Sequence, residues 1–256
     1  MKKIIVFSLI FAANSAFSQN IPFTKEVYDQ WVSMRVGTGK PIYWYCFGEI
    51  YSYPEGKLVA RMEGFDAARL QKINADSAIQ LNRKIFYYED AKTGEIVDEV
   101  DGKKVNHIKY PYQFITYSRK NDKLITWVEQ GSGANINKMG PGEGIIARKM
   151  GENIEYAAPV FLNFTTPRGK YEAYENYDFF VNTNERNTEK KYQLFWNRYG
   201  DLAPFLGTGK GVIQLVSYRL DSFEKLPEKL KKRVREQDKM WLEPPVSVEE
   251  IKSLQK

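Results

Sequence analysis

One carboxylate group, that of Glu49, occurs among aromatic rings in the stretch Pro41–Tyr53, which reads PIYWYCFGEIYSY. In a β-strand, alternate residues share one face. One face then carries Ile42, Trp44, Cys46, Gly48 and Ile50, and the other carries Tyr43, Tyr45, Phe47, Glu49, Tyr51 and Tyr53. The first face is apolar and typical of a core. The second combines rings, hydroxyl groups and one carboxylate, which suits the inside of a ligand cavity.

A turn follows this stretch and brings further charges beside Glu49. Pairing Tyr53 with Lys57 across the turn sets Glu49 opposite Arg61. The same register sets Phe47 opposite Glu63 and Tyr45 opposite Phe65. We therefore expect one group of ligand contacts made of Tyr45, Phe47, Glu49, Tyr51, Arg61 and Glu63. The alternative is a cross-strand ion pair on a wet aromatic surface, which contributes only ~0.2–1 kcal/mol.

Two later stretches also combine rings with isolated charges. In YEAYENYDFF, one face carries Tyr171, Ala173, Glu175, Tyr177 and Phe179, and Asp178 falls on the other face. In KYQLFWNRY, one face carries Tyr192, Leu194, Trp196 and Arg198. These faces fit a cavity wall, and they also fit an ordinary β-core. We expect Trp196 and Arg198 to contact the ligand.

Acid–base chemistry without a metal is the enzymatic alternative. A buried Glu49 or Asp178 with a raised pKa could exchange protons, and Arg61, Arg198 or a tyrosine could stabilise an oxyanion. The candidate catalytic residues are therefore Glu49, Arg61 and Asp178. Isomerase, lyase and glycosidase chemistry all remain open at this level.

Cysteine and histidine usage excludes several classes of site. The chain has one cysteine, Cys46, and one histidine, His107, so it has no internal disulfide and no HExxH or multi-histidine metal site. We interpret Cys46 as a core thiol and His107 as a strand or loop residue. The glycine clusters match neither the phosphate-loop nor the dinucleotide motif. We therefore expect no metal and no cofactor.

The charge pattern does not favour nucleic acid as a partner. The formal net charge is +6, with lysine and arginine interleaved with acidic residues. The densest basic run, KLKKRVR at 229–235, is flanked by Glu228 and Glu236 and is typical of a solvated helix face.

The beginning of the chain has the pattern of a secretory signal peptide. A short positive segment precedes the ten-residue apolar run Ile4–Ala13, and Ala16-Phe17-Ser18 fits the small-x-small cleavage rule. We expect cleavage after Ser18, so that residues 19–256 act in the periplasm or outside the cell. The apolar run is too short to span a bilayer, and no second run follows.

The remaining chain is predicted to be mainly β, as a single domain over residues 19–256. Four hairpins are expected, with turns at 53–57, 91–94, 119–123 and 151–153. Residues 130–144 read as a long glycine-rich loop, and residues 65–72 read as one or two helical turns. Pro227 and the capping box Ser247–Glu250 predict two helices near the C-terminus. The fold class is an antiparallel barrel-like domain or sandwich with a few peripheral helices.

Several of these segments together resemble a family of exported bacterial proteins that contain a domain of unknown function. The resemblance rests on the G-x-x-Y of Gly48–Tyr51, the Y-x-D-x-x-T-G-E of Tyr88–Glu95 and the W-x-R of Trp196–Arg198, in this order. It would span most of residues 19–256 and implies one compact domain, with no assigned chemistry. The chain departs at Ala203–Gly207, where the family tends to have tryptophan and methionine, so a ligand bound there would differ.

Three functions remain open at the level of the sequence. The first is a β-rich domain that binds a small, partly apolar ligand in an aromatic-lined cavity. The second is the metal-independent enzyme, and the third is a surface protein that binds partners through exposed aromatic patches.

Overall fold

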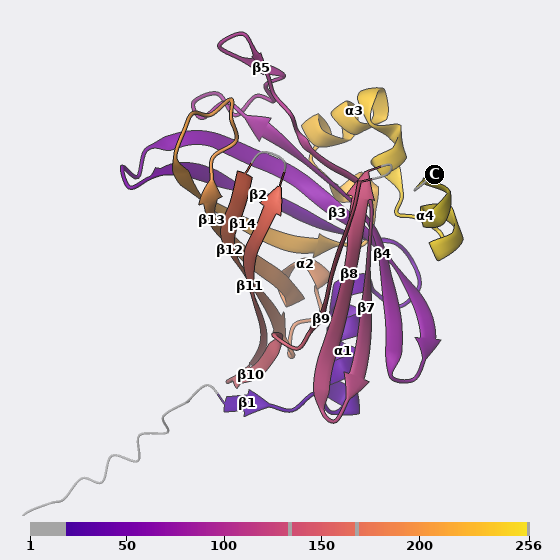
Figure 1. Cartoon of the computed structure of the whole chain (residues 1–256). Coiled ribbons are helices and arrows are strands. Elements are labelled where there is room, and N and C mark those ends of the chain that lie inside the picture. The colour runs from indigo at the N-terminus through magenta and orange to yellow at the C-terminus, as the bar shows by residue number, and fades with distance from the viewer. Residues whose placement is uncertain (1–18, 133–134, 167–168, 255–256) are drawn as a thin grey trace, which may run out of the picture.

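The computed structural model describes residues 19–132, 135–166 and 169–254 (Figure 1). The expected signal peptide, residues 1–18, lies outside these described residues. The strands are β1 Gln19–Ile21, β2 Ile42–Tyr53, β3 Leu58–Asn74, β4 Ser77–Glu89, β5 Glu99–Val100, β6 Lys103–Lys104, β7 Ile108–Lys120, β8 Lys123–Ser132, β9 Asn135–Gly142, β10 Ile146–Met150, β11 Asn153–Thr166, β12 Gly169–Asn182, β13 Tyr192–Asp201 and β14 Lys210–Leu220. The helices are α1 Lys25–Val36, α2 Thr188–Lys191, α3 Glu228–Gln237 and α4 Val248–Leu254, with 3₁₀ turns η1 Phe223–Lys225 and η2 Lys239–Leu242.

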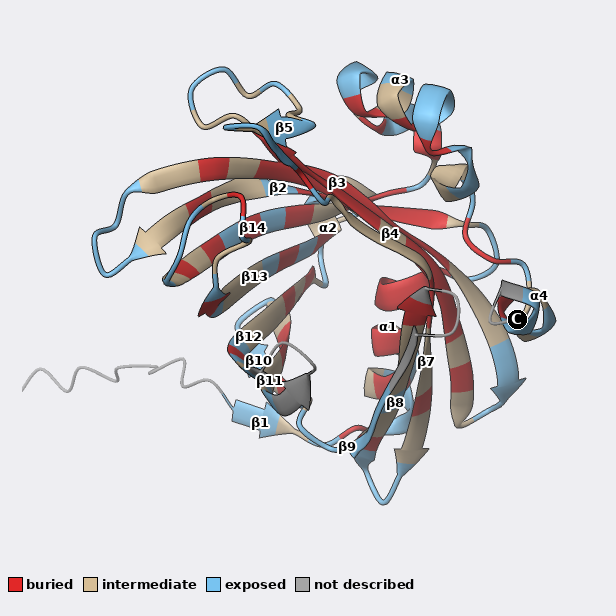
Figure 2. Ribbon diagram, turned by 45° about the horizontal axis from the view of Figure 1, so that its top comes forward, coloured by how far each residue is buried: buried red, intermediate tan, exposed pale blue. Residues whose placement is uncertain are grey.

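Twelve of the strands form one antiparallel sheet in the order β1-β10-β11-β12-β13-β14-β2-β3-β4-β7-β8-β9. The sheet curls into a half-barrel whose concave side surrounds α1 (Figure 2). We call the concave side the bore face and the convex side the outer face. The short strands β5 and β6 form a separate pair between β4 and β7.

Side-chain alternation divides β2 between the two faces. Trp44 and Ile50 are buried among residues of the bore, whereas Tyr43 and Tyr45 are buried beneath the C-terminal segment on the outer face. The strands approach closely at Gly48, where an added Cβ would lie 1.9 Å from the carbonyl oxygen of Gln214. Only glycine allows this approach, so the sheet can coil tightly at this point.

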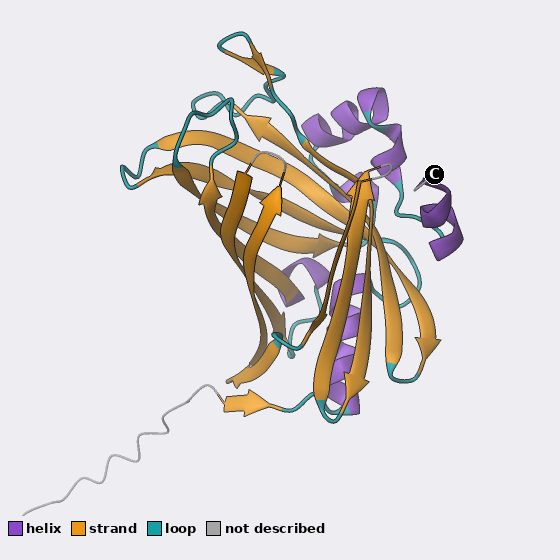
Figure 3. Ribbon diagram, in the orientation of Figure 1, coloured by secondary structure: helices purple, strands orange, loops and turns teal. Residues whose placement is uncertain are grey.

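Helix α1 lies inside the half-barrel and joins its two walls. Thr24 caps the helix, since its side chain accepts a hydrogen bond from the backbone N–H of Val27. Trp31 packs edge-on against Tyr117 of β7 and Phe179 of β12, with ring centroids 5.6 and 5.4 Å away. Figure 3 shows the helix enclosed by strands. The apolar surface of α1 therefore fills one part of the half-barrel.

The C-terminal segment covers part of the outer face. Phe223, Leu230 and Val234 pack over outer-face residues of β2, β3 and β4. One half of the expected capping box of α4 is present, because Ser247 Oγ accepts from the backbone N–H of Glu250 at 3.2 Å, whereas the Glu250 carboxylate accepts from the backbone N–H of Val246. The predicted class, mainly β with two helices near the C-terminus, is confirmed. The sandwich alternative is wrong, since one continuous sheet forms both walls.

All four expected turns are present, and the structure corrects other local expectations. Residues 65–72 are part of the long strand β3, because their side chains alternate between the two buried faces. At 91–94 the chain turns back as expected, and Glu89 and Ile96 form an isolated antiparallel bridge. The second arm does not extend into a long strand, because the chain continues into the β5–β6 pair and β4 pairs with β7. Within residues 130–144, β8 continues to Ser132 and β9 begins at Asn135.

Candidate functional site

The register predicted for the first hairpin is confirmed over most of its length. Glu49 pairs with Arg61, and the expected pairs of Phe47 and Tyr45 also form. An irregularity after Ile50 then shifts the register, so Tyr51 pairs with Leu58 and the expected pairing of Tyr53 with Lys57 is wrong. A β-bulge of this kind is common near a sheet edge.

The aromatic face of β2 lies on the outer face of the sheet. We expected its rings to line the interior, but the bore receives the alternate residues Trp44, Cys46 and Ile50 instead. Tyr45 is buried under α3, and Phe47, stacked on it with centroids 5.5 Å apart, is 41% exposed. The residues of this first predicted group are therefore close together, but outside the barrel.

Glu63 belongs to a buried ionic cluster that holds α3 against the sheet. Tyr45 donates a hydrogen bond to Glu63 at 2.5 Å. Lys229 of α3 forms ion pairs with Glu63, at 3.1 Å, and with Glu89. Burial raises the pKa of Glu89 to about 6, although the hydrogen bond from Lys229 acts in the opposite direction. The mutual pairing of these charges indicates a structural role.

Asp178 does not join Glu49 and Arg61. It lies on the outer face of β12, where it accepts a hydrogen bond from Asn176 at 2.5 Å. Strands β13 and β14 separate β12 from β2. Burial raises the pKa of Asp178, as the sequence analysis expected of a catalytic carboxyl, but the three candidate catalytic residues do not form one site.

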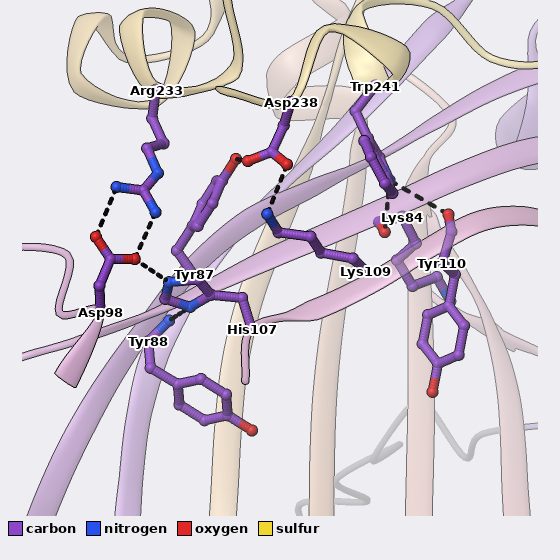
Figure 4. A network of polar contacts seen from close by, with 10 residues as sticks. All are labelled: Lys84, Tyr87, Tyr88, Asp98, His107, Lys109, Tyr110, Arg233, Asp238 and Trp241. Atoms are coloured by element: carbon purple, nitrogen blue, oxygen red, sulfur yellow. Dashed lines mark hydrogen bonds and ion pairs between the residues drawn. The ribbon is translucent and has the colours of Figure 1, made fainter. Parts of the chain in front are cut away.

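His107 is held by contacts to both ring nitrogens (Figure 4). Nδ1 accepts from the backbone N–H of Tyr88 at 3.2 Å, so the proton is on Nε2, which donates to Asp98 at 3.1 Å. Arg233 of α3 contacts both carboxylate oxygens of Asp98. This arrangement ties α3 to the segment before β7 and leaves neither nitrogen free to act as a base.

The bore face brings the two other predicted contacts, Trp196 and Arg198, together with residues of β12. Arg198 pairs across the strands with Glu175, with a distance of 3.5 Å between Nε and the carboxylate. Arg198 also donates to the hydroxyl of Tyr171. Tyr177 donates to Glu175 at 2.6 Å, and its ring lies 5.9 Å from that of Trp196.

The opposite wall contributes tyrosines that face this pair. Burial raises the pKa of Tyr88 to about 12, while the positive charge of Arg198 acts to lower it. Burial also raises the pKa of Tyr110, and Glu175 adds to that effect. Because β4 and β7 lie on the other side of the curled sheet from β12 and β13, these electrostatic effects act across the bore. Figure 4 shows Tyr87 pointing toward α3, whereas Tyr88 and Tyr110 point the other way.

Lys84 lies beside Tyr110 on the same wall, since the two residues are paired between β4 and β7. We use the name bore cluster for Lys84, Tyr88, Tyr110, Tyr171, Glu175, Tyr177, Trp196 and Arg198. A chain of buried amides continues from it along the bore face: Asn82 donates to Asp66 at 2.5 Å and to Gln113 at 3.2 Å. Gln113 in turn donates to Gln130 at 2.5 Å.

Sequence reasoning placed five of the eight residues of the bore cluster on possible cavity walls, but chose only Trp196 and Arg198 as ligand contacts. Glu175 lies on the β12 face that was recognised, but it was not chosen as a ligand contact. Pairing β12 with β13 would have identified Glu175. No local pattern distinguishes Lys84, Tyr88 or Tyr110, because the opposite wall becomes adjacent only when the sheet curls.

Two hollows lie near the bore. One of about 20 Å³ lies beside Tyr88 and Arg198, under the loop that contains Leu202 and Leu206. That volume suffices for about one water molecule. The loop includes the segment Ala203–Gly207, and Phe205 packs edge-on against Tyr88 with centroids 4.8 Å apart. The second hollow, of about 310 Å³, is lined by Lys25, Tyr28, Asp29, Val32, Lys72, Asn74, Ala75 and Ala78.

Two kinds of feature are absent from the described residues. Within residues 19–132, 135–166 and 169–254, no group of three histidine, cysteine, aspartate or glutamate side chains is placed to hold a metal ion. No helix in the described part of the chain is long and apolar enough to cross a membrane.

Residues 146–255 match the model of a family described as protein of unknown function (DUF1838). This match confirms the resemblance to an uncharacterised family. The matched part contains Trp196 and Arg198 but neither the Gly48–Tyr51 nor the Tyr88–Glu95 motif, so the match covers less of the chain than expected. No curated protein and no solved structure matches the chain.

Proposed function

We propose that this chain is a binding protein that holds a small, partly apolar ligand against the bore cluster. The observation that carries the proposal is the Arg198–Glu175 pair, which faces Tyr88 and Tyr110 across the bore. The two charged side chains remain 16% and 15% exposed. Sites of this kind combine aromatic contact area with a few oriented polar groups.

The pattern at the start of the chain supports action after export. We propose that residues 1–18 are removed and that the ligand is met in the periplasm or outside the cell. A protein that acts outside the cytoplasm is often stabilised by disulfides, and one cysteine cannot form an internal disulfide. Here the buried residues on both faces of the central strands stabilise the fold instead.

The test is native mass spectrometry of the exported protein, purified without detergent or organic solvent. We expect a bound organic molecule that leaves on denaturation. When the released molecule is titrated back, Trp196→Ala should weaken its binding, while Phe195→Ala should not. Phe195 is the matched control because it precedes Trp196 in β13, with its ring exposed on the outer face. Equal affinity for both variants would reject the bore as the binding site.

An acid–base enzyme is the second candidate, and Glu175 supports it. The Glu175 carboxylate accepts from Tyr177 and lies beside Arg198. Burial raises the pKa of Tyr177 well above its ordinary value, so this hydroxyl stays protonated near neutral pH and serves as a hydrogen-bond donor to Glu175. This candidate predicts that the released molecule is chemically converted on incubation with the protein. Glu175→Gln should abolish the conversion while leaving binding measurable.

A further inference from the structure

We propose that the bore cluster takes an organic monoanion, such as a carboxylate, and that Lys84 is the residue that binds its charged group. This inference rests on the proposed function and adds the chemical class of the ligand. It is carried by the position of Lys84, by its lack of a partner and by the partners that the other cations of the bore face already have.

Lys84 is positioned by strand pairing on both sides. It lies opposite Asp66 of β3 and opposite Tyr110 of β7. It shares its face with Phe86, which is buried in the bore, whereas Ile85 is buried under α3 on the outer face. Burial raises the pKa of the Cys46 thiol in the bore, and the Lys84 ammonium acts in the opposite direction.

No described residue forms a hydrogen bond or an ion pair with the Lys84 ammonium, although its side chain is partly buried. The facing carboxylate, Asp66, accepts a hydrogen bond from Asn82 at 2.5 Å instead. A partly buried ammonium without a partner is costly to desolvate. A carboxylate in the bore would supply the missing acceptor.

The other cations of the bore face already have partners. Arg198 is engaged by Glu175 and Tyr171, and Arg35 contacts Tyr117 and lies over the ring of Phe179 at 4.6 Å. Arg219 donates to the carbonyl oxygens of Ser33 and Met34 in α1. Lys84 is therefore the cation of this group whose charge is not engaged by a described residue. One ammonium suits a singly charged group better than a phosphate dianion, which is usually bound by several donors.

The backbone around Lys84 is supported from the outer face (Figure 4). Trp241 of η2 donates to the carbonyl oxygens of Lys84, at 2.9 Å, and Tyr110, at 3.2 Å. The β4–β7 register shifts between Asn82 and Lys84, so carbonyl groups there lack regular ladder partners. Trp241 therefore acts as a positioning residue for the two strands that carry Lys84 and Tyr110.

The test compares two probes of the same shape and different charge. Benzoate and benzamide are titrated into the ligand-free protein, with binding measured by calorimetry. We expect the wild type to prefer benzoate by at least about tenfold, which is the scale of one hydrogen bond to a charged group. Lys84→Met should remove this preference, and Lys84→Arg should retain most of it. Lys232→Met is the control, because Lys232 is an exposed residue of α3.

Each other outcome overturns the inference. Equal binding of both probes by the wild type, binding of neither, or an unchanged preference in Lys84→Met would show that Lys84 does not bind an anion. Stronger binding of phenylphosphonate than of benzoate would show that the site prefers a dianion to a monoanion. These results leave the proposed function standing if the native adduct is present and depends on Trp196, whereas loss of that dependence rejects the proposed function itself.

Discussion

At the scale of single residues, burial gives similar side chains different roles on the two faces of the sheet. Glu63 and Glu89 on the outer face are neutralised by Lys229 of α3, which makes them anchors for the helix. Glu175 on the bore face is paired with Arg198 but keeps part of its surface exposed. The same residue type therefore stabilises the fold in one place and, in the proposed function, contacts the ligand in the other.

Glu89 should make the stability of the protein depend on pH. Burial raises its pKa in the folded state to about 6, above the ordinary value near 4.5. The folded state then binds more protons than the unfolded state between these two values, so the stabilising contribution is complete below pH 4.5 and is lost as pH rises through 6. A shift of this size corresponds to about 2 kcal/mol in the free energy of unfolding.

The measurement is urea unfolding of the wild type and Glu89→Gln at several pH values from 4 to 8. The wild type should lose stability relative to Glu89→Gln as the pH rises across this interval. Glu236→Gln on the exposed side of α3 serves as the control and should follow the wild type. Parallel pH profiles for all three proteins would contradict the assigned shift.

At the scale of elements, the C-terminal segment supports the strands that carry part of the bore cluster. Trp241 satisfies two backbone carbonyl groups at the β4–β7 irregularity. Asp238, at the end of α3, accepts hydrogen bonds from Tyr87 at 2.7 Å and Lys109 at 2.5 Å. These contacts connect η2 and α3 to the outer sides of β4 and β7, so the bore residues of these strands depend on the segment behind them.

Trp241→Phe should lower the free energy of unfolding by about 1–3 kcal/mol, because two buried carbonyl groups lose their donor. Met240→Leu, next to it and exposed, should change stability little. Urea unfolding of both variants measures the difference. If Trp241→Phe were as stable as Met240→Leu, the indole would not be what supports Lys84 and Tyr110.

Much of the element pattern could be predicted from the sequence, and the exceptions have physical causes. Alternation and turn residues predict the strands, and Pro227 and Ser247 predict the two C-terminal helices. Helix α1 was not predicted, because a helix enclosed by a curled sheet carries apolar residues on several sides and lacks a clean stripe. Residues 65–72 were predicted to be helical, since a strand buried on both faces loses the alternation of polar and apolar residues.

The candidate site was less predictable, because its geometry depends on curvature. Strand pairing predicted the contact of Glu49 with Arg61, which is local. Which face of β2 becomes concave is decided by the whole sheet, through close approaches such as that at Gly48. The aromatic face was therefore placed on the wrong side, while Trp196 and Arg198 were placed with the correct neighbours on their own strand.

At the scale of the whole molecule, one curled sheet makes two separate surfaces from the same strands. The outer face is partly covered by the C-terminal segment, and the bore is partly filled by α1 (Figure 2). Trp31 contacts both walls, so α1 connects β7 to β12 across the bore. The proposed ligand site lies between these walls and not on the outer aromatic surface.

The most direct measurement compares the two faces through one arginine on each. Arg198→Met and Arg61→Met are purified in the same way as the wild type, and the fraction that retains the bound molecule is measured by native mass spectrometry. Arg198 lies in the bore and Arg61 on the outer face, and both have cross-strand glutamate neighbours, so the two substitutions are matched. If the ligand binds in the bore, as we propose, Arg198→Met loses the bound molecule while Arg61→Met keeps it. Retention by Arg198→Met together with loss by Arg61→Met would contradict binding in the bore and place the site on the outer face.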